Sequence, residues 1–164
     1  MGVRPQKREE KLEDIKVLCG ESLAEFIDRP NLDPIFIIGK DRSHDIVKRL
    51  KEEFEYNFLS DLSAVDNTPS KPRFQVTYNL YSMKKQTRLM VKVNVDDGES
   101  VKSITDLWKG ANWLEREVFD MFGITFDGHP KLTRLYLPDQ FVGHPLRKEF
   151  PYNYRQAYGE DRKR

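Results

Sequence analysis

Cysteine is nearly absent from this chain of 164 residues, whose single thiol belongs to Cys19. One cysteine cannot form a disulfide within the chain, which fits a reducing compartment. One thiolate also cannot hold an iron–sulfur cluster, because such clusters need several. The sequence therefore excludes a cluster that this chain binds alone.

Long apolar runs are missing too. No stretch approaches the roughly 20 apolar residues of a membrane-spanning helix. The N-terminal residues also lack the apolar core of a signal peptide. We therefore expect any membrane association to be peripheral and to depend on a partner.

The chain has no excess of charge of either sign. Its 28 basic and 27 acidic residues give a net charge of +1, whereas a nucleic-acid-binding domain carries a basic excess on one face. Local basic runs lie at 4–11 and 160–164, and we interpret both as solvated tails. A glycine-rich phosphate loop and the G-x-S-x-G motif are also absent. Neither the charge nor the motifs therefore indicate a nucleic-acid-binding protein, a nucleotide-binding protein or a serine hydrolase.

What is present is the pattern of one polar globular domain followed by a tail, with 38% apolar and 34% charged residues. Three stretches have helical spacing, at 6–28, 43–56 and 103–123. Gly20 is expected to interrupt the first of them. In the third, Ser103 with Asp106 predicts a capped start, and Gly123 predicts the end.

Between the helices the apolar spacing changes to every second residue. This alternation predicts strands at 57–66, 73–82 and 87–96, besides a short buried strand at 35–39. One-sided alternation is typical of an antiparallel sheet with one solvated face, so helices must cover the other. The sequence therefore predicts an α+β fold over 1–123, a two-layer domain whose mainly antiparallel or mixed sheet is packed by helices.

The remaining residues, 124–164, are predicted to form a long extended C-terminal tail. They include four prolines, which remove backbone donors and force extended geometry on the preceding residue. Yet they also carry many large apolar side chains: Phe126, Leu132, Leu135, Tyr136, Leu137, Phe141, Leu146, Phe150, Tyr152, Tyr154 and Tyr158. A segment without helical periodicity does not readily build a core of its own. We therefore predict that it lies along another protein.

Catalysis by paired carboxylates is the first functional alternative for the last helix. Glu115 and Glu117 are two residues apart, so on a helix their side chains diverge by about 200°. They cannot share a proton or a substrate atom in this arrangement. We interpret both as charges that flank the apolar stripe and pair with basic groups of this chain or of a partner.

A metal site is the second alternative. His129, His144 and Glu115 are ligand types that zinc accepts, but the fifteen residues between the histidines match no compact ligand motif. The alternative is that each Gly-His-Pro makes the same tight turn. There the glycine supplies an unusual φ, the histidine bonds a backbone carbonyl or a carboxylate, and the proline stiffens the exit.

The basic residues of the tail leave two interpretations open. Arg134, Arg147 and Lys148 suit a clamp for an anion, and they equally suit ion pairs with an acidic partner surface. Such pairs set register and specificity more than affinity. We favour the partner.

These residues together resemble the signature of the 30-kDa subunit family of NADH–quinone oxidoreductase, respiratory complex I, also called its C subunit. The resemblance covers about 38 contiguous residues: Glu115-Arg116-Glu117, Asp120, Met121-Phe122, Gly128-His129-Pro130, Arg134 and Gly143-His144-Pro145-Leu146-Arg147-Lys148. Thr133 departs from the family, which generally places a basic residue beside Arg134. One charge for the partner contact is therefore missing.

The resemblance implies a peripheral-arm subunit without a cofactor of its own, in a complex that carries FMN and iron–sulfur clusters on other subunits. It implies packing against the quinone-site D subunit and proximity to the cluster subunits B and I. NADH and quinone would bind elsewhere in the complex. The complex would translocate protons, and this chain would lie peripherally on the cytoplasmic side of the cell inner membrane.

The same resemblance implies that the signature residues serve the subunit interface rather than catalysis. The predicted interface residues are Glu115, Arg116, Glu117, Asp120, His129, Arg134, His144, Arg147 and Lys148. Equivalent chains occur in ferredoxin-dependent photosynthetic complexes, coenzyme-dependent dehydrogenases and membrane-bound nickel–iron hydrogenases. A stand-alone metal-dependent enzyme using His129, His144 and Glu115 is the alternative of another class.

Overall fold

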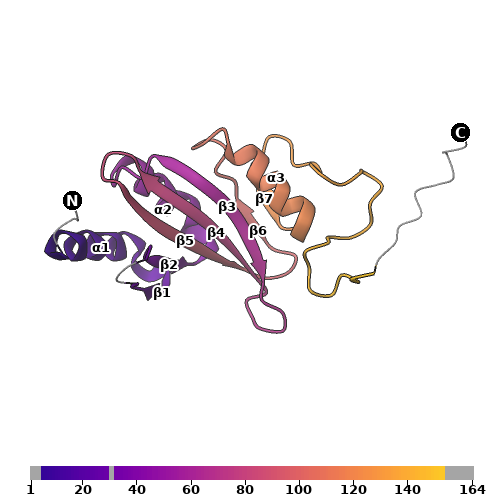
Figure 1. Ribbon diagram of the computed structural model, residues 1–164, viewed down its shortest axis with the longest axis horizontal. Coiled ribbons are helices and arrows are strands. Elements are labelled where there is room, and N and C mark those ends of the chain that lie inside the picture. Colours follow the sequence, from indigo (N-terminus) through magenta and orange to yellow (C-terminus); the bar gives the residue numbers. More distant parts are fainter. Residues whose placement is uncertain (1–4, 30–31, 154–164) are drawn as a thin grey trace, which may run out of the picture.

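The computed structural model describes residues 5–29 and 32–153, with side chains from residue 11 onward (Figure 1). Arg4, the side chains of 5–10 in the first basic run, the run at 160–164, Tyr154 and Tyr158 therefore lie outside what the structure describes. In chain order the elements are α1 (Pro5–Cys19), η1 (Gly20–Ser22), β1 (Leu23–Ile27), β2 (Ile35–Ile38), η2 (Lys40–Arg42), α2 (Ser43–Glu52), β3 (Phe58–Asp66), β4 (Phe74–Ser82), β5 (Thr87–Val95), β6 (Ser100–Lys102), α3 (Ala111–Phe122) and β7 (Thr125–Asp127).

The main sheet has five strands in the order β1-β2-β5-β4-β3. Only β2 and β5 run parallel; the other neighbours are antiparallel. A second, two-stranded parallel sheet joins β6 to β7. The predicted α+β class with a mixed sheet is confirmed.

Alternation along β4 and β5 divides the sheet into a core face and a solvated face. Val76 pairs with Val93 and Tyr78 with Val91 on the core face, and all four are fully buried. The same core takes apolar residues from all three helices: Leu12, Ile15, Leu18, Ile46, Val47, Leu50, Ala111, Val118 and Phe122. The other face is polar, and there the Gln75 amide donates to Asn94 Oδ1 at 3.0 Å. The pattern therefore produces the two layers.

The first predicted helix was too long. Gly20 adopts φ +51° and α1 ends at Cys19, so residues 23–27 form an edge strand instead. The rings of Phe26 and Phe36 pack at 4.9 Å between β1 and β2. Pairing with the next strand of the chain, β2, overrides the local helical spacing here.

The third predicted helix began too early. Residues 103–110 form turns, and α3 starts at Ala111. Ser103 and Asp106 do not cap it: the Ser103 hydroxyl donates to Glu115 at 2.7 Å, and Asp106 pairs with His44. Gly123 ends α3 with φ +75°, as predicted.

The packed domain extends beyond the predicted boundary at residue 123. Ile124 and Phe126 are buried in the core, and β7 pairs with β6. Residues 128–153, here called the C-terminal segment, contain neither helix nor strand and pass from the start of α3 to its C-terminal end and the nearby strand ends (Figure 1). Among the described residues, none of the helices combines the length and apolarity needed to cross a bilayer.

Candidate subunit interface

Asp120 is the centre of the contacts between α3 and the C-terminal segment. Its carboxylate is fully buried, and Oδ1 accepts from the Arg134 guanidinium at 2.7 Å. Oδ2 accepts three consecutive backbone N–H groups, of Leu135, Tyr136 and Leu137, at 2.8–3.0 Å. Burial alone would raise the pKa of Asp120, but the N–H of Leu137, the Arg134 cation and the other N–H groups hold that pKa below its usual value. The carboxylate is thus a charged acceptor around which the segment turns.

Arg134 ties two parts of the segment together. Besides Asp120, its guanidinium donates to the carbonyls of Phe141 at 3.1 Å and Gly143 at 3.0 Å. A planar cation with several fixed donors suits this task, since one side chain satisfies several acceptors at once. The Arg134 side chain therefore links Asp120 of α3 to residues 141 and 143.

The second Gly-His-Pro sequence and the residues after it, 143–148, cap the C-terminal end of α3. A helix leaves its last four carbonyls without partners inside the helix. Gly123 N–H bonds the Phe119 carbonyl, and the next three carbonyls accept from His144 Nδ1, Leu146 N–H and Arg147 Nε. The Arg147 cation also suits the negative end of the helix dipole. Residues 144–147 therefore complete a helix that ended more than twenty residues earlier.

Glycine is required where these elements meet. A Cβ added to Gly123 would lie 2.6 Å from His144 Nε2 and 2.9 Å from an Arg147 guanidinium nitrogen. Because Gly123 also has a positive φ, any larger residue would be strained and would displace the cap.

Both Gly-His-Pro sequences form the predicted turns. Gly128 and Gly143 have φ +82° and +98°, and each histidine bonds a backbone carbonyl. His129 Nε2 donates to Asn112 at 3.2 Å while its Nδ1 accepts from the Lys131 N–H. His144 Nδ1 donates to Asp120 O at 3.0 Å. The turn interpretation of these motifs is confirmed.

The three side chains of the metal alternative bond separate parts of the chain. Glu115 is fully buried and accepts from Ser103 Oγ and the Ile104 N–H, away from either histidine's partner. Within residues 5–29 and 32–153, no group of three or more His, Cys, Asp or Glu side chains is arranged to hold a metal.

The other two charges of the Glu-Arg-Glu triplet face the C-terminal segment. Arg116 donates to the carbonyls of Thr133 at 3.0 Å and Arg134 at 2.8 Å, and it lies over the Trp113 ring. The Tyr136 hydroxyl donates to Glu117 at 3.3 Å. As predicted, Glu115 and Glu117 point to different parts of the chain.

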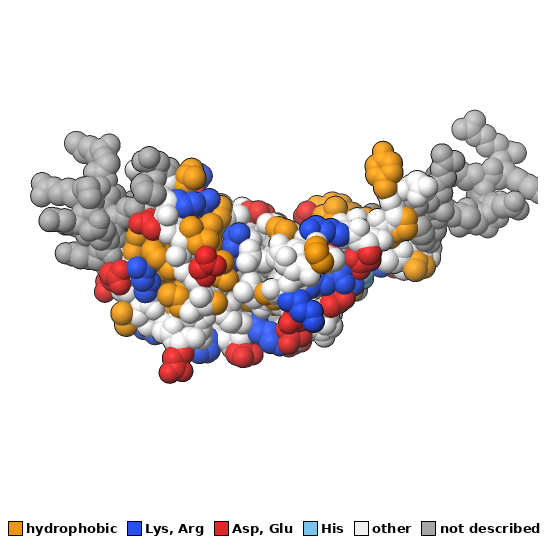
Figure 2. Space-filling model, turned by 90° about the horizontal axis from the view of Figure 1, so that it is seen from below, with side chains coloured by type: hydrophobic (Ala, Val, Ile, Leu, Met, Phe, Trp, Pro, Cys, Tyr) orange, Lys and Arg blue, Asp and Glu red, His pale blue; other side chains and the backbone are white. Residues whose placement is uncertain are grey.

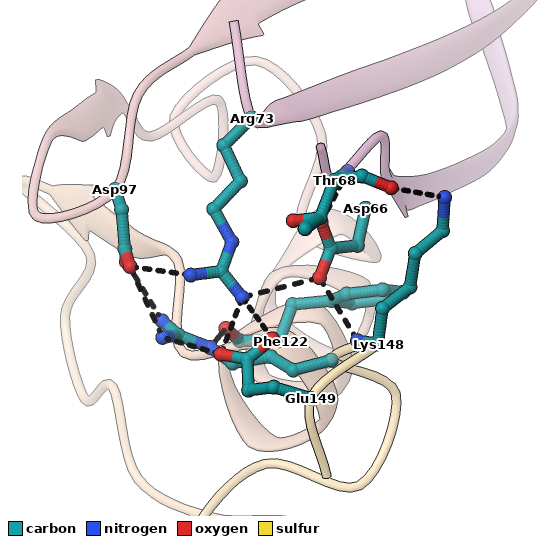
Figure 3. Close-up of polar contacts among 8 residues, drawn as sticks. Asp66, Thr68, Arg73, Asp97, Phe122, Lys148 and Glu149 are labelled. Atoms are coloured by element: carbon teal, nitrogen blue, oxygen red, sulfur yellow. Dashed lines mark hydrogen bonds and ion pairs between the residues drawn. The ribbon is translucent and has the colours of Figure 1, made fainter. Parts of the chain in front are cut away.

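A second polar cluster fastens the end of the segment to the strand ends (Figure 3). Arg73 donates to Asp66 at 3.2 Å, to Asp97 at 2.7 Å and to Glu149. The backbone N–H of Lys148 bonds Asp66 at 3.0 Å, and its ammonium bonds the Thr68 carbonyl at 2.6 Å. Arg147 pairs with Asp97 at 3.1 Å. Sequence reasoning missed Asp66, Arg73, Asp97 and Glu149, because single charges in separate turns leave no local pattern.

We expect Arg73→Gln to lower the free energy of unfolding by about 2 kcal/mol, because it leaves the buried Asp66 without its cation. Urea unfolding of the purified chain measures this. Arg49→Gln is the matched control, since Arg49 pairs with Glu53 on an exposed helix face, where a much smaller loss is expected. Equal losses in the two variants would contradict the role assigned to the cluster.

Residues 36–156 match the family described as respiratory-chain NADH dehydrogenase, 30 Kd subunit, a span that includes the whole C-terminal segment. The chain belongs to this family. The predicted resemblance is therefore confirmed.

Named relatives agree with this membership. The C subunit of NADH-quinone oxidoreductase from Geotalea uraniireducens (strain Rf4) is 48% identical over 114 residues, 67% of this chain and 70% of the relative. The same subunit from Roseiflexus sp. (strain RS-1) is 46% identical over 117 residues, covering 70% and 67%.

Two solved structures are similar in fold. A trypsin-resistant fragment of Nqo5 has a TM-score of 0.65 and 31% identity, covering 77% of this chain and 99% of the fragment. A chain of an archaeal membrane-bound sulfane sulfur reductase has a TM-score of 0.75 over 96% of this chain and 98% of its own. Its identity is 24%, so it supports the fold alone.

The signature residues of this 30 Kd subunit family mostly face inward here. Glu115 and Asp120 are fully buried, and Arg116, His129, Arg134, His144 and Arg147 all bond other parts of this chain. Direct contact of these side chains with a partner stays a prediction. Their contacts shape the segment that carries the outer surface.

The outer surface of the C-terminal segment carries large apolar side chains among charged ones. Tyr136, Val142 and Leu146 are 65%, 68% and 54% exposed, and Tyr152 is fully exposed. Figure 2 shows hydrophobic side chains on the outside of the arm that this segment forms, at the right. The charged pair Asp120 and Arg134 lies inside, while these four large apolar side chains lie outside, beside exposed charges such as Lys148 and Glu149. Apolar surface of this kind marks a contact with another protein.

Proposed function

We propose that this chain is a structural subunit of the peripheral arm of a proton-translocating NADH–quinone oxidoreductase, and that the C-terminal segment docks it on partner subunits. The exposed large apolar side chains of that segment, Tyr136, Val142, Leu146 and Tyr152, carry the proposal. Ion pairs and helix-capping bonds fix the shape of the segment from inside, so its exposed apolar side chains are held ready for a partner. A preorganised surface binds with a smaller loss of conformational entropy.

In this proposal the chain contributes shape rather than chemistry. It binds no redox cofactor, while FMN and the iron–sulfur clusters belong to other subunits. The partners are the quinone-site D subunit, which it holds in electron-transfer range of the terminal cluster, and the cluster subunits B and I. NADH and quinone bind elsewhere in the complex. The chain lies peripherally at the inner membrane, on its cytoplasmic side.

Family membership and the names of the relatives support NADH as the electron donor. The likeness to the sulfane sulfur reductase does not favour another donor, since it is a likeness of fold. The electron donor docks on other subunits, so co-purified flavoprotein subunits are the direct evidence for it.

The test is affinity purification of the tagged chain from its native membranes, with mass spectrometry and metal analysis. We expect flavoprotein, iron–sulfur and quinone-site subunits to be recovered with it. Leu146→Asp should lower their recovery about tenfold or more, because it places a charge in the apolar contact. Val17→Asp, on the exposed face of α1, is the matched control and should leave recovery unchanged.

Two results would overturn the proposal. One is recovery of the chain alone with a stoichiometric metal, which would favour the metal-dependent enzyme. The other is a Leu146→Asp chain that assembles normally while turnover per assembled complex is lost, which would place this segment in the catalytic machinery.

A further inference from the structure

Both tryptophans of the chain line one apolar groove, away from the polar clusters. The groove has a volume of about 350 Å³ and lies between the start of β3 and the first turn of α3. Its side chains are Phe58, Leu59, Trp108, Lys109, Trp113 and Leu114. Phe58 is 51% exposed and Trp113 is 58% exposed. Such exposure of large aromatic residues side by side marks a binding surface rather than core.

The tryptophan rings are held in place by this chain. Trp108 Nε1 donates to the Asn57 carbonyl at 2.9 Å, and the Lys51 ammonium lies 5.0 Å from its ring centre. The Arg116 guanidinium lies 5.1 Å from the Trp113 ring centre while bonding the segment's carbonyls. The groove is therefore preformed, with little side-chain entropy left to lose on binding.

The lining of the groove carries positive charge and no negative charge. Lysine is the only ionisable residue type among the lining residues, and Lys51 and Arg116 stand at the two rings. The exposed Lys109 ammonium makes no hydrogen bond or ion pair with any described residue. An apolar floor with an uncompensated cation is complementary to an apolar side chain that has a carboxylate beside it.

We propose that this groove binds an acidic segment of a partner subunit, one that inserts a large apolar side chain between Trp108 and Trp113 and pairs an Asp or Glu with Lys109. The inference rests on the proposed function. Arg116 lies over Trp113 and bonds the carbonyls of Thr133 and Arg134, so the groove adjoins the C-terminal segment and the two form one continuous docking face. The volume lies at the low end for small-molecule sites and suits one or two side chains.

Site-specific crosslinking in the assembled complex identifies the occupant. Trp113 is replaced by the photoreactive amino acid p-benzoylphenylalanine in the tagged chain, which is irradiated in native membranes. We expect a crosslink to an acidic stretch of another subunit. The same amino acid at Met83, which is 61% exposed in the turn between β4 and β5, is the control and should not mark that stretch.

Three crosslinking results would overturn the inference: a crosslink to a second copy of this chain, a crosslink to a stretch without Asp or Glu, or no crosslink from a chain that still co-purifies with its partners. A wild-type chain that recovers no partner subunits refutes the proposed function instead. The two failures are therefore distinguishable.

Charge reversal tests the role of Lys109 separately. We expect Lys109→Glu to weaken retention in the complex about tenfold at low salt, with the difference shrinking as ionic strength rises. Lys102→Glu, an exposed lysine of β6, is the matched control for net charge. Equal retention of both variants at low salt would refute the ion pair.

Discussion

The variant Asp120→Ala is expected to release the C-terminal segment from α3 and to lower the free energy of unfolding by about 3–5 kcal/mol. The substitution leaves the half-buried Arg134 cation without its partner and three backbone N–H groups without an acceptor. Removing one member of a buried ion pair is costly because the other charge stays buried and uncompensated.

Amide hydrogen exchange of the purified chain gives the local result, and urea unfolding gives the global one. Exchange should accelerate at Leu135, Tyr136 and Leu137, while the strands β4 and β5 stay protected. Asp139→Ala is the matched control, because Asp139 lies exposed in the same segment. Asp120→Asn should have an effect between those of Asp120→Ala and Asp139→Ala, since the amide keeps an acceptor oxygen but lacks the charge. Unchanged protection in Asp120→Ala would refute the central role of this carboxylate.

The same contacts show how far the sequence could predict this site. The turns at both Gly-His-Pro sequences were predictable, because positive φ at glycine and the rigidity of proline are local properties. The inward direction of Asp120 and Arg147 was not. Charged residues are expected at surfaces, and the need of the α3 carbonyls for donors appears only once the end of the helix and the return of the chain are known.

In the fold, too, local sequence patterns predict some features, while contacts between distant residues determine others. The alternation in β4 and β5 predicted strands, and both formed. The helical spacing through residues 23–27 did not predict β1, because this strand forms by pairing with β2, which comes later in the chain. Arg73 and Glu149 are 76 residues apart and bond in a cluster that no local pattern announces. The sequence therefore predicts elements and turns better than it predicts the side-chain contacts between them.

Glu115 gives the second large expected effect, a stability that falls as pH rises. The carboxyl is fully buried and has two hydrogen-bond donors, Ser103 Oγ and the Ile104 N–H. It forms no ion pair with a Lys or Arg of the described residues. Burial raises its pKa to about 7, against the lowering effect of the two hydrogen bonds; Asp106 raises it further and His44 lowers it.

The direction of the pH dependence of stability follows from proton linkage. The folded chain binds this proton more tightly than the unfolded chain does, so the stabilisation is fully present below a pH of about 4.5 and is lost as pH rises through about 7. A difference of this size corresponds to roughly 3 kcal/mol. The charged form also lies close enough to the buried Tyr78 hydroxyl to raise the pKa of that phenol, after the larger effect of burial.

Glu115→Gln should therefore remove most of the decline in stability between pH 5 and pH 8. Glutamine keeps an oxygen to accept the Ile104 N–H and an amide to donate to Ser103, but it never carries charge. We expect the variant to match the wild type near pH 5 and to exceed it at pH 8 by about 2–3 kcal/mol. Urea unfolding at pH 5, 6, 7 and 8 measures both curves.

Glu117→Gln is the control for this series, because it removes one negative charge from the half-buried side of the same helix that faces Tyr136. Its pH dependence should follow that of the wild type. A Glu115→Gln curve that stays parallel to the wild-type curve would mean that the buried carboxyl is ionised throughout this range. In that case the donors of residues 103 and 104 stabilise the charge more strongly than burial destabilises it. The start of α3 would then be held to β6 by a charged contact, as its far end is held to the C-terminal segment by Asp120.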